Sequence, residues 1–143
     1  MVRIKFYTAL FATSMILAVP AYADNAGPQN KPAPPPHLAP SGAKLYANIC
    51  QACHMEDARG ATGAATIPAL AGNQALSLPG YPISVVLYGK GAMPAMGKIL
   101  DDAQIAAVLN YVRQNFGNKF PDAITAAAVK SARVPGREYS DGY

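Results

Sequence analysis

The sequence has no cluster of basic residues, although it contains 12 lysines and arginines against eight acidic residues. The basic side chains are spread along the chain, for example at Lys44, Arg59, Lys90, Lys98, Arg113, Lys119, Lys130, Arg133 and Arg137. A nucleic-acid-binding surface gathers such residues on one face, where they contact phosphates. The scattered pattern therefore argues against a nucleic acid as partner.

Signals for β-strands are also scarce. Apolar and polar residues do not alternate over any length, and no Asn-Gly or Asp-Gly pair separates β-branched segments. Helical patterns occur in four segments: AKLYANICQAC after Ser41 and Gly42, ISVVLYG, the stretch from Asp101 to Gly117, and ITAAAVKSAR with Thr125 as its cap. The sequence predicts an all-α fold of three to five helices with long loops, and such loops need something to fold around.

The best helix signal begins at Asp101, because Gln104 follows three residues later in the pattern of a capping box. Apolar residues then recur at helical spacing up to Val112, and Gly117 is the expected stop. The last helix should end before Pro135.

A single long apolar run lies near the N-terminus, and no second one follows. It comes after two basic residues, extends from Phe6 to Val19 and is followed by Ala-Tyr-Ala, as in a signal peptide. About 14 apolar residues are fewer than the roughly 20 that cross a bilayer. We expect residues 1–23 to be removed on secretion, leaving a mature chain that begins at Asp24 and has no membrane span.

Residues 24–40 are rich in proline and alanine and have no apolar period. Such a segment forms an extended, polyproline-like chain without a core of its own. We therefore expect a flexible arm in which His37 is solvated.

The sequence contains only two cysteines, and both stand in Cys50-Gln51-Ala52-Cys53-His54. The Cys-x-x-Cys-His pattern is the signature of covalent haem attachment. Two thiols three positions apart at a helix end can reach both vinyl groups on one porphyrin edge, while the next imidazole lies beneath the iron. The motif predicts one covalently attached haem c on Cys50 and Cys53, with its iron bound by His54.

Three other functions of the cysteine pair remain as alternatives. A thioredoxin-like redox pair normally follows a strand in a βαβ unit, which this sequence lacks. A zinc site would need more ligands, yet the only other histidine is His37. A disulfide between Cys50 and Cys53 would close a very short and strained loop.

With these motifs, the sequence resembles a class I cytochrome c over nearly the whole region from residue 42 to about residue 117. The resemblance implies that Gly42 and Tyr46 pack the first helix against Val108 and Tyr111 of a later helix. It assigns residues 41–120 to the cytochrome domain and residues 121–143 to a C-terminal helix and irregular tail.

The resemblance also implies the surroundings of the iron. The Pro68 carbonyl should accept a hydrogen bond from Nδ1 of His54, which orients a ligating ring. Met93 should be the second axial ligand, because Pro94 disfavours helical backbone at Met93 and so presents its sulfur from an extended loop. Met96 should instead pack in the haem pocket.

Within the class, the sequence is similar to monohaem cytochrome c subunits or domains that serve periplasmic dehydrogenases. This similarity implies a non-catalytic electron carrier in the periplasm, whose partners are a dehydrogenase catalytic subunit, a downstream cytochrome or an oxidase. A free carrier that shuttles between respiratory complexes is the alternative. A haem enzyme or ligand sensor would require a methionine that leaves the iron.

Overall fold

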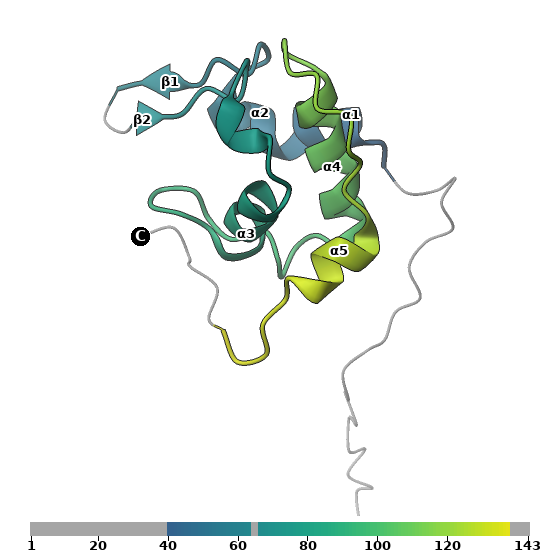
Figure 1. Cartoon of the computed structure of the whole chain (residues 1–143). Helices are drawn as coiled ribbons and strands as arrows, with labels where there is room; N and C mark the ends of the chain where they lie inside the picture. The colour runs from purple at the N-terminus through teal and green to yellow at the C-terminus, as the bar shows by residue number, and fades with distance from the viewer. Residues whose placement is uncertain (1–39, 64–65, 138–143) are drawn as a thin grey trace, which may run out of the picture. The chain divides into compact units, whose positions relative to one another are not determined.

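This computed structural model describes residues 40–63 and 66–137. Its first helical stretch runs from Gly42 to His54 (Figure 1). It consists of α1 (Gly42–Leu45), a π-helical segment η1 (Tyr46–Cys50) and α2 (Gln51–His54). The Ser41 side chain caps it by accepting a hydrogen bond from the Lys44 amide. The predicted signal peptide and residues 24–39 of the predicted arm lie outside the described residues.

Helix α4 (Asp102–Gln114) has the predicted capping box. The Asp101 carboxylate accepts from the Gln104 amide at 2.8 Å, and the Gln104 side chain accepts from the Asp101 amide at 3.0 Å. The apolar side of α4 is buried at Ile105, Val108, Leu109 and Val112. The fold is therefore built around this helix.

Two shorter helices and a 3-10 turn complete the helical part. They are η2 (Gln74–Leu76), α3 (Gly80–Tyr88) and α5 (Ala126–Ser131). The Thr125 hydroxyl caps α5 as predicted, by accepting from the Ala128 amide. Val129 of α5 is fully buried, and α5 packs against α4. The mostly helical architecture confirms the predicted all-α class.

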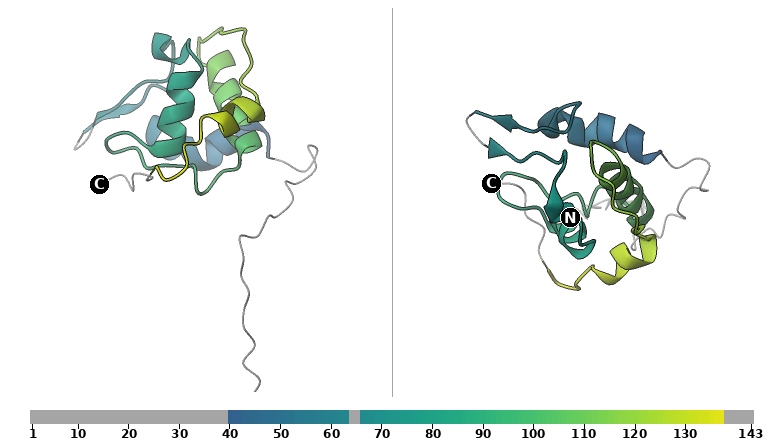
Figure 2. Two further views of the ribbon diagram at one scale, coloured as in Figure 1. Left: turned by 60° about the horizontal axis from the view of Figure 1, so that its bottom comes forward. Right: turned by 45° about the horizontal axis from the view of Figure 1, so that its top comes forward.

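A small antiparallel hairpin follows the first helical stretch and projects from the body (Figures 1 and 2). It pairs β1 (Ala61–Thr62) with β2 (Thr66–Ile67). The sequence showed no strand signal here, because two-residue strands are too short to show an alternating pattern. Gly60 fits the entry to the hairpin with a φ of +69°, and a Cβ atom there would lie 2.1 Å from the Ile67 carbonyl oxygen.

The contact between α1 and α4 brings the first helical stretch onto the core. A Cβ atom on Gly42 would lie nearest to the Ala107 carbonyl and to Tyr111. The Tyr46 ring packs on Tyr111 with centroids 5.8 Å apart, and on Phe116 at 4.9 Å. The close packing predicted for Gly42 and Tyr46 is therefore present, and it fixes the direction in which the stretch carries the cysteines.

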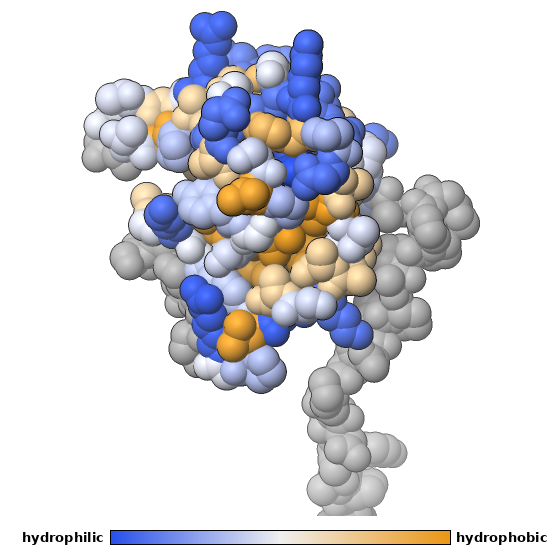
Figure 3. Space-filling model, in the orientation of Figure 1, coloured by the Kyte–Doolittle hydropathy of each residue, from blue (hydrophilic) through white to orange (hydrophobic). Residues whose placement is uncertain are grey.

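All described residues belong to a single compact unit. Within those residues, no helix combines the length and apolar character needed to cross a bilayer. Figure 3 shows apolar side chains gathered in the middle of one face, over the region between α3, α4 and α5.

Candidate functional site

The cysteine motif occupies the end of the first helical stretch. Cys50 is half-buried in η1, Cys53 is exposed in α2, and His54 is buried. Both thiols are free, with no disulfide between them. The helix ends at once after the histidine, because Met55 adopts a φ of +66° that an α-helix cannot continue.

His54 has one protein partner. Its Nδ1 lies 3.1 Å from the Pro68 carbonyl oxygen, and because a carbonyl can only accept, Nδ1 carries the proton. The structure gives no partner to Nε2 among the described residues. Burial lowers the pKa of His54, an effect that the Pro68 contact partly opposes. The ring is therefore held in the neutral tautomer whose Nε2 lone pair can bind a metal.

The segment around Pro68 is itself anchored to two distant parts of the chain. The Ala58 carbonyl accepts hydrogen bonds from the amides of Leu70 and Ala71 at 2.7 and 2.9 Å. The buried Asn118 side chain donates to the Leu70 carbonyl at 2.8 Å and accepts from the Asn73 amide at 3.0 Å. These bonds fix the position of the carbonyl that orients His54.

The sequence analysis did not identify Asn118 as part of the site. Its side chain also donates to the Val112 carbonyl at 2.9 Å, and so joins the end of α4 to the Pro68 segment. A single asparagine 50 positions after Pro68 leaves no local pattern to detect. The one feature that distinguishes Asn118 in the sequence is its position directly after Gly117, at the predicted end of the helix.

Tyr46 supports the other side of the motif. Its hydroxyl donates to the Met55 carbonyl at 2.7 Å, which secures the residue that follows the histidine. Burial raises the pKa of Tyr46 to about 12, with smaller contributions from Cys50, Asp57 and Tyr111. The phenol is therefore neutral and remains a hydrogen-bond donor at physiological pH.

The electrostatics of Cys50 bear on the type of chemistry that the thiols can perform. Burial, with a smaller contribution from Cys53, raises the pKa of Cys50 to about 11. A thioredoxin-like pair instead lowers the pKa of its attacking thiol to roughly 7 or below. The environment of Cys50 thus disfavours the redox-active dithiol alternative.

The two candidate methionine ligands lie in the connection between α3 and α4. Lys90 and Met93 close a tight turn, in which each amide donates to the other residue's carbonyl at 3.0 and 3.1 Å. Gly91 allows this turn with a φ of +57°. Met96 packs against the core and donates its amide to the Val86 carbonyl at 2.8 Å. Of the two side chains, only that of Met96 is thus part of the core packing.

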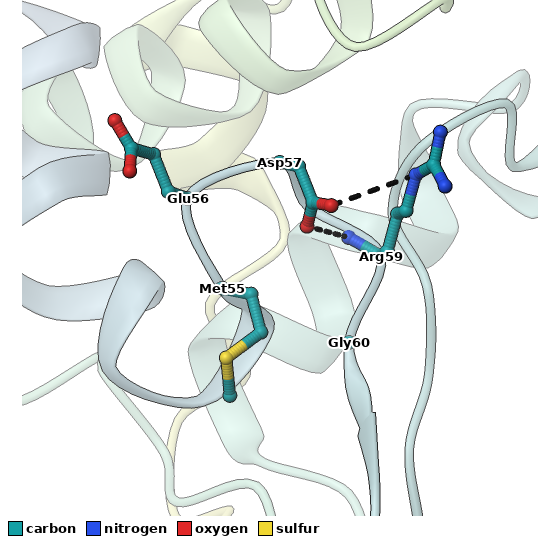
Figure 4. A pocket seen from close by; sticks show the side chains of 5 residues that line it. All are labelled: Met55, Glu56, Asp57, Arg59 and Gly60. Carbon is teal, nitrogen blue, oxygen red and sulfur yellow. Dashed lines mark hydrogen bonds and ion pairs between the residues drawn. The ribbon is translucent and has the colours of Figure 1, made fainter.

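An open depression lies beside the motif and is lined by Met55, Glu56, Asp57, Arg59 and Gly60 (Figure 4). Asp57 and Arg59 form an ion pair across its edge at 3.5 Å, and both side chains are largely exposed. An exposed pair of this kind contributes little stability. The charged rim does not suit an apolar ring, so this depression is distinct from the candidate site.

Within residues 40–63 and 66–137, no three His, Cys, Asp or Glu side chains are grouped to hold a metal ion by themselves. A haem iron needs only axial ligands from the protein, because the porphyrin supplies four nitrogens. Two thiols at positions i and i+3 of a helix end, followed by an imidazole whose Nδ1 is already bonded, fit this group. The donor set therefore matches haem.

Comparison with known proteins agrees with this geometry. Residues 37–112 match the family described as cytochrome C oxidase, cbb3-type, subunit III. The chain is 35% identical over 112 residues to the alcohol dehydrogenase (quinone) cytochrome c subunit of Gluconacetobacter polyoxogenes, covering 69% of this chain and 24% of that subunit. It is 34% identical over 112 residues to the fructose dehydrogenase cytochrome subunit of Gluconobacter japonicus, covering 68% and 23%.

A shorter relative matches over most of its own length. Cytochrome c-552 of Thermus thermophilus is 35% identical over 114 residues, which cover 65% of this chain and 84% of that protein. The chain thus spans only about a quarter of the dehydrogenase subunits that it matches.

Proposed function

Because this chain belongs to the cytochrome c family, whose cofactor is a covalently bound haem with its iron, we propose that it transfers single electrons through one haem on Cys50 and Cys53. In this proposal His54 and Met93 would hold the iron. The chain is an electron carrier rather than an enzyme, as are its relatives.

The observation that supports the site most strongly is the contact between His54 and Pro68. The 3.1 Å hydrogen bond fixes the tautomer and leaves Nε2 for the iron. Hydrogen bonding at the other ring nitrogen also raises the basicity of a ligating imidazole. Because Asn118 and Ala58 anchor the Pro68 segment, contacts within the protein itself hold the orientation of the ring.

The assignment of Met93 rests on the turn that it closes with Lys90. This turn holds the Met93 backbone in place while its side chain remains outside the core packing. Met96 already packs against the core, so it would have to leave that position to bind iron. A thioether ligand favours the reduced state of a haem and raises its reduction potential.

The haem supplies a redox centre that changes by one electron. The residues of the chain would occupy both axial positions, which leaves none for a substrate. Such a site is suited to outer-sphere electron transfer, which agrees with the similarity to the cytochrome subunits of dehydrogenases.

We propose a periplasmic dehydrogenase as the partner that supplies the electrons. The alcohol, fructose and gluconate dehydrogenase cytochrome subunits are the similar proteins that support this. Secretion would follow from the signal peptide proposed for residues 1–23. We further propose that residues 24–40 form a flexible arm, residues 41–120 the cytochrome domain and residues 121–143 a C-terminal segment.

A free carrier that shuttles between respiratory complexes is the second candidate. One observation favours it: the match to cytochrome c-552 covers 84% of that protein, against 24% of the alcohol dehydrogenase subunit. Purification from the native periplasm distinguishes the two. A stable subunit elutes with a large catalytic chain, whereas a free carrier elutes alone.

The absorption spectrum of the mature protein tests the haem and its ligands. We expect a c-type α-band in the reduced protein and a weak near-infrared band from the bond between methionine sulfur and ferric iron. Met93→Ala should abolish the near-infrared band, and Met96→Ala should preserve it. The ligand assignment is wrong if the band survives in Met93→Ala.

Attachment is tested separately by mass. Unfolded mature protein should retain the mass of one haem, and a Cys50→Ser, Cys53→Ser double variant should lose it on denaturation. A colourless wild-type protein with two free thiols would refute the electron-carrier proposal altogether.

A further inference from the structure

A short segment after α5 contacts both ends of the loop that carries Met93. We refer to residues 132–134 as the C-terminal strap and to residues 89–100 as the methionine loop. The methionine loop leaves α3 after Tyr88 and reaches α4 at Asp101. Figures 1 and 2 show the chain after α5 turning back toward α3.

At the start of the loop, the strap is bonded to Tyr88. The Tyr88 hydroxyl donates to the Ala132 carbonyl at 3.0 Å and accepts from the Val134 amide at 2.5 Å. The Tyr88 side chain is buried, and its two bonds to the strap are partly buried. Since Gly89 follows directly, the strap fixes the point at which the loop begins.

At the end of the loop, the strap uses Arg133. Its guanidinium donates to the Gly97 carbonyl at 2.7 Å and to the Leu100 carbonyl at 3.3 Å. The same group donates to the Asp102 carboxylate at 2.6 Å, in an ion pair whose side chains are each 26% exposed. One planar cation therefore ties the loop end to the first residue of α4.

The loop between these two anchors has only a few backbone bonds of its own to the rest of the fold. The Met96 amide bonds Val86, and the Gly97 amide bonds Leu87 at 3.2 Å. Gly89 and Gly91 both adopt positive φ. Because glycine has no Cβ atom, the backbone at these two residues is conformationally permissive. The strap is therefore the element that anchors the methionine loop at both of its ends.

We propose that Arg133 is a positioning residue for the distal ligand, which holds the methionine loop so that the Met93 sulfur stays within reach of the iron. This inference rests on the proposed assignment of Met93 as that ligand. A methionine leaves the iron more readily when the loop that carries it can move, so a bond that restrains the loop lowers the population of protein in which the iron is open.

Arg133→Gln tests the inference, because glutamine removes the charge and cannot reproduce the three-way contact. We expect the apparent affinity of the reduced holoprotein for carbon monoxide to rise about tenfold, equivalent to about 1.4 kcal/mol. We also expect a weaker near-infrared methionine band and faster hydrogen exchange at the Met96 and Gly97 amides. Arg133→Lys should recover part of the effect.

Lys130→Gln is the matched control, since it removes one positive charge from an exposed position on the neighbouring helix. It should bind carbon monoxide as the wild type does. Ile124→Ala controls for general loss of stability, because Ile124 is buried before α5 and lies outside both the strap and the loop. It should lower the free energy of unfolding while leaving the near-infrared band intact.

The outcomes separate this inference from the proposed function. If Arg133→Gln retains wild-type carbon monoxide affinity and loop exchange, while Met93→Ala loses the near-infrared band, the strap role is overturned and the ligand assignment stands. If Ile124→Ala raises carbon monoxide affinity as much as Arg133→Gln does, the effect is general instability and the strap role is again overturned. If wild type lacks the band, the ligand assignment itself fails.

Discussion

Gly42 on α1 lies so close to Ala107 on α4 that a Cβ atom on the glycine would stand 2.2 Å from the Ala107 carbonyl oxygen. The same atom would lie 2.8 Å from the Tyr111 Cβ. Both neighbours belong to the backbone or to its first side-chain atom, so neither can turn away. The crossing of α1 and α4 therefore depends on the absence of a side chain at residue 42, and the cysteine motif follows directly from this crossing.

Gly42→Ala should separate α1 from α4 and destabilise the fold. Overpacking of a close contact costs about 1–3 kcal/mol, and we expect a loss in this range in the free energy of unfolding, measured with denaturant. Gly80→Ala is the control, because nothing lies within 4 Å of a Cβ at that position in α3. Equal stability of the two variants would show that the helix crossing tolerates a methyl group.

Arg113 should also stabilise the fold, because its guanidinium is completely buried. It donates to the carbonyls of Leu76, Ser77 and Asp122, and to the Asp122 carboxylate at 2.7 Å. Arg113→Met should lower the free energy of unfolding by at least about 1–3 kcal/mol, the cost of one unsatisfied buried polar group.

The Asp122 carboxylate contributes less than the carbonyls, since its side chain is 54% exposed. Asp122→Asn should therefore cost only about 0–1 kcal/mol in the same unfolding experiment. A loss as large as that of Arg113→Met would mean that the ion pair, rather than the backbone contacts, is the main function of Arg113.

Tyr46 makes the stability of the fold depend on pH in the alkaline range. Its pKa is raised from 10.0 to about 12, mainly by burial, so the folded state favours the neutral phenol. In the unfolded chain the phenol ionises near pH 10, so its contribution is complete below pH 10 and is lost as the pH rises to 12. The loss corresponds to about 2–3 kcal/mol.

Comparison with Tyr46→Phe isolates this effect from other alkaline changes. The stability difference between wild type and variant should be constant from pH 7 to pH 9 and should fall between pH 10 and pH 12. Denaturant unfolding followed by circular dichroism measures it. A difference that does not change with pH would show that Tyr46 ionises normally in the folded protein.

Asn118 should influence His54 through the Pro68 segment. Asn118→Leu removes the bonds to Leu70 and Asn73, and we expect the hydrogen bond from Nδ1 of His54 to Pro68 to weaken as a result. Faster solvent exchange of the Nδ1 proton, observed by nuclear magnetic resonance, is the expected result. Asn115→Ala serves as the control, because the Asn115 side chain bonds only the Tyr111 carbonyl within its own helix.

The local signals in the sequence were sufficient for the helices and for the attachment motif. The capping box at Asp101, the Thr125 cap and the spacing of Cys50, Cys53 and His54 depend on residues within a few positions of one another. Such short-range patterns are set by backbone geometry and can be detected without a structure. The family itself was also evident from these residues.

Only the tertiary structure identified the residues that hold the site together from a distance. Asn118 bonds to a residue 48 positions away, Arg133 to one 36 away and Tyr88 to one 44 away. Hydrogen bonds of this kind satisfy buried carbonyls and amides whose neighbours are decided by how the helices pack, so the sequence contains no periodic trace of them. The chain thus encodes its helices and the Cys-x-x-Cys-His motif locally, and its resemblance to a known family already indicated Pro68 as the partner of His54, whereas the packing of the helices decides which distant residues anchor the Pro68 segment and the loop that carries Met93.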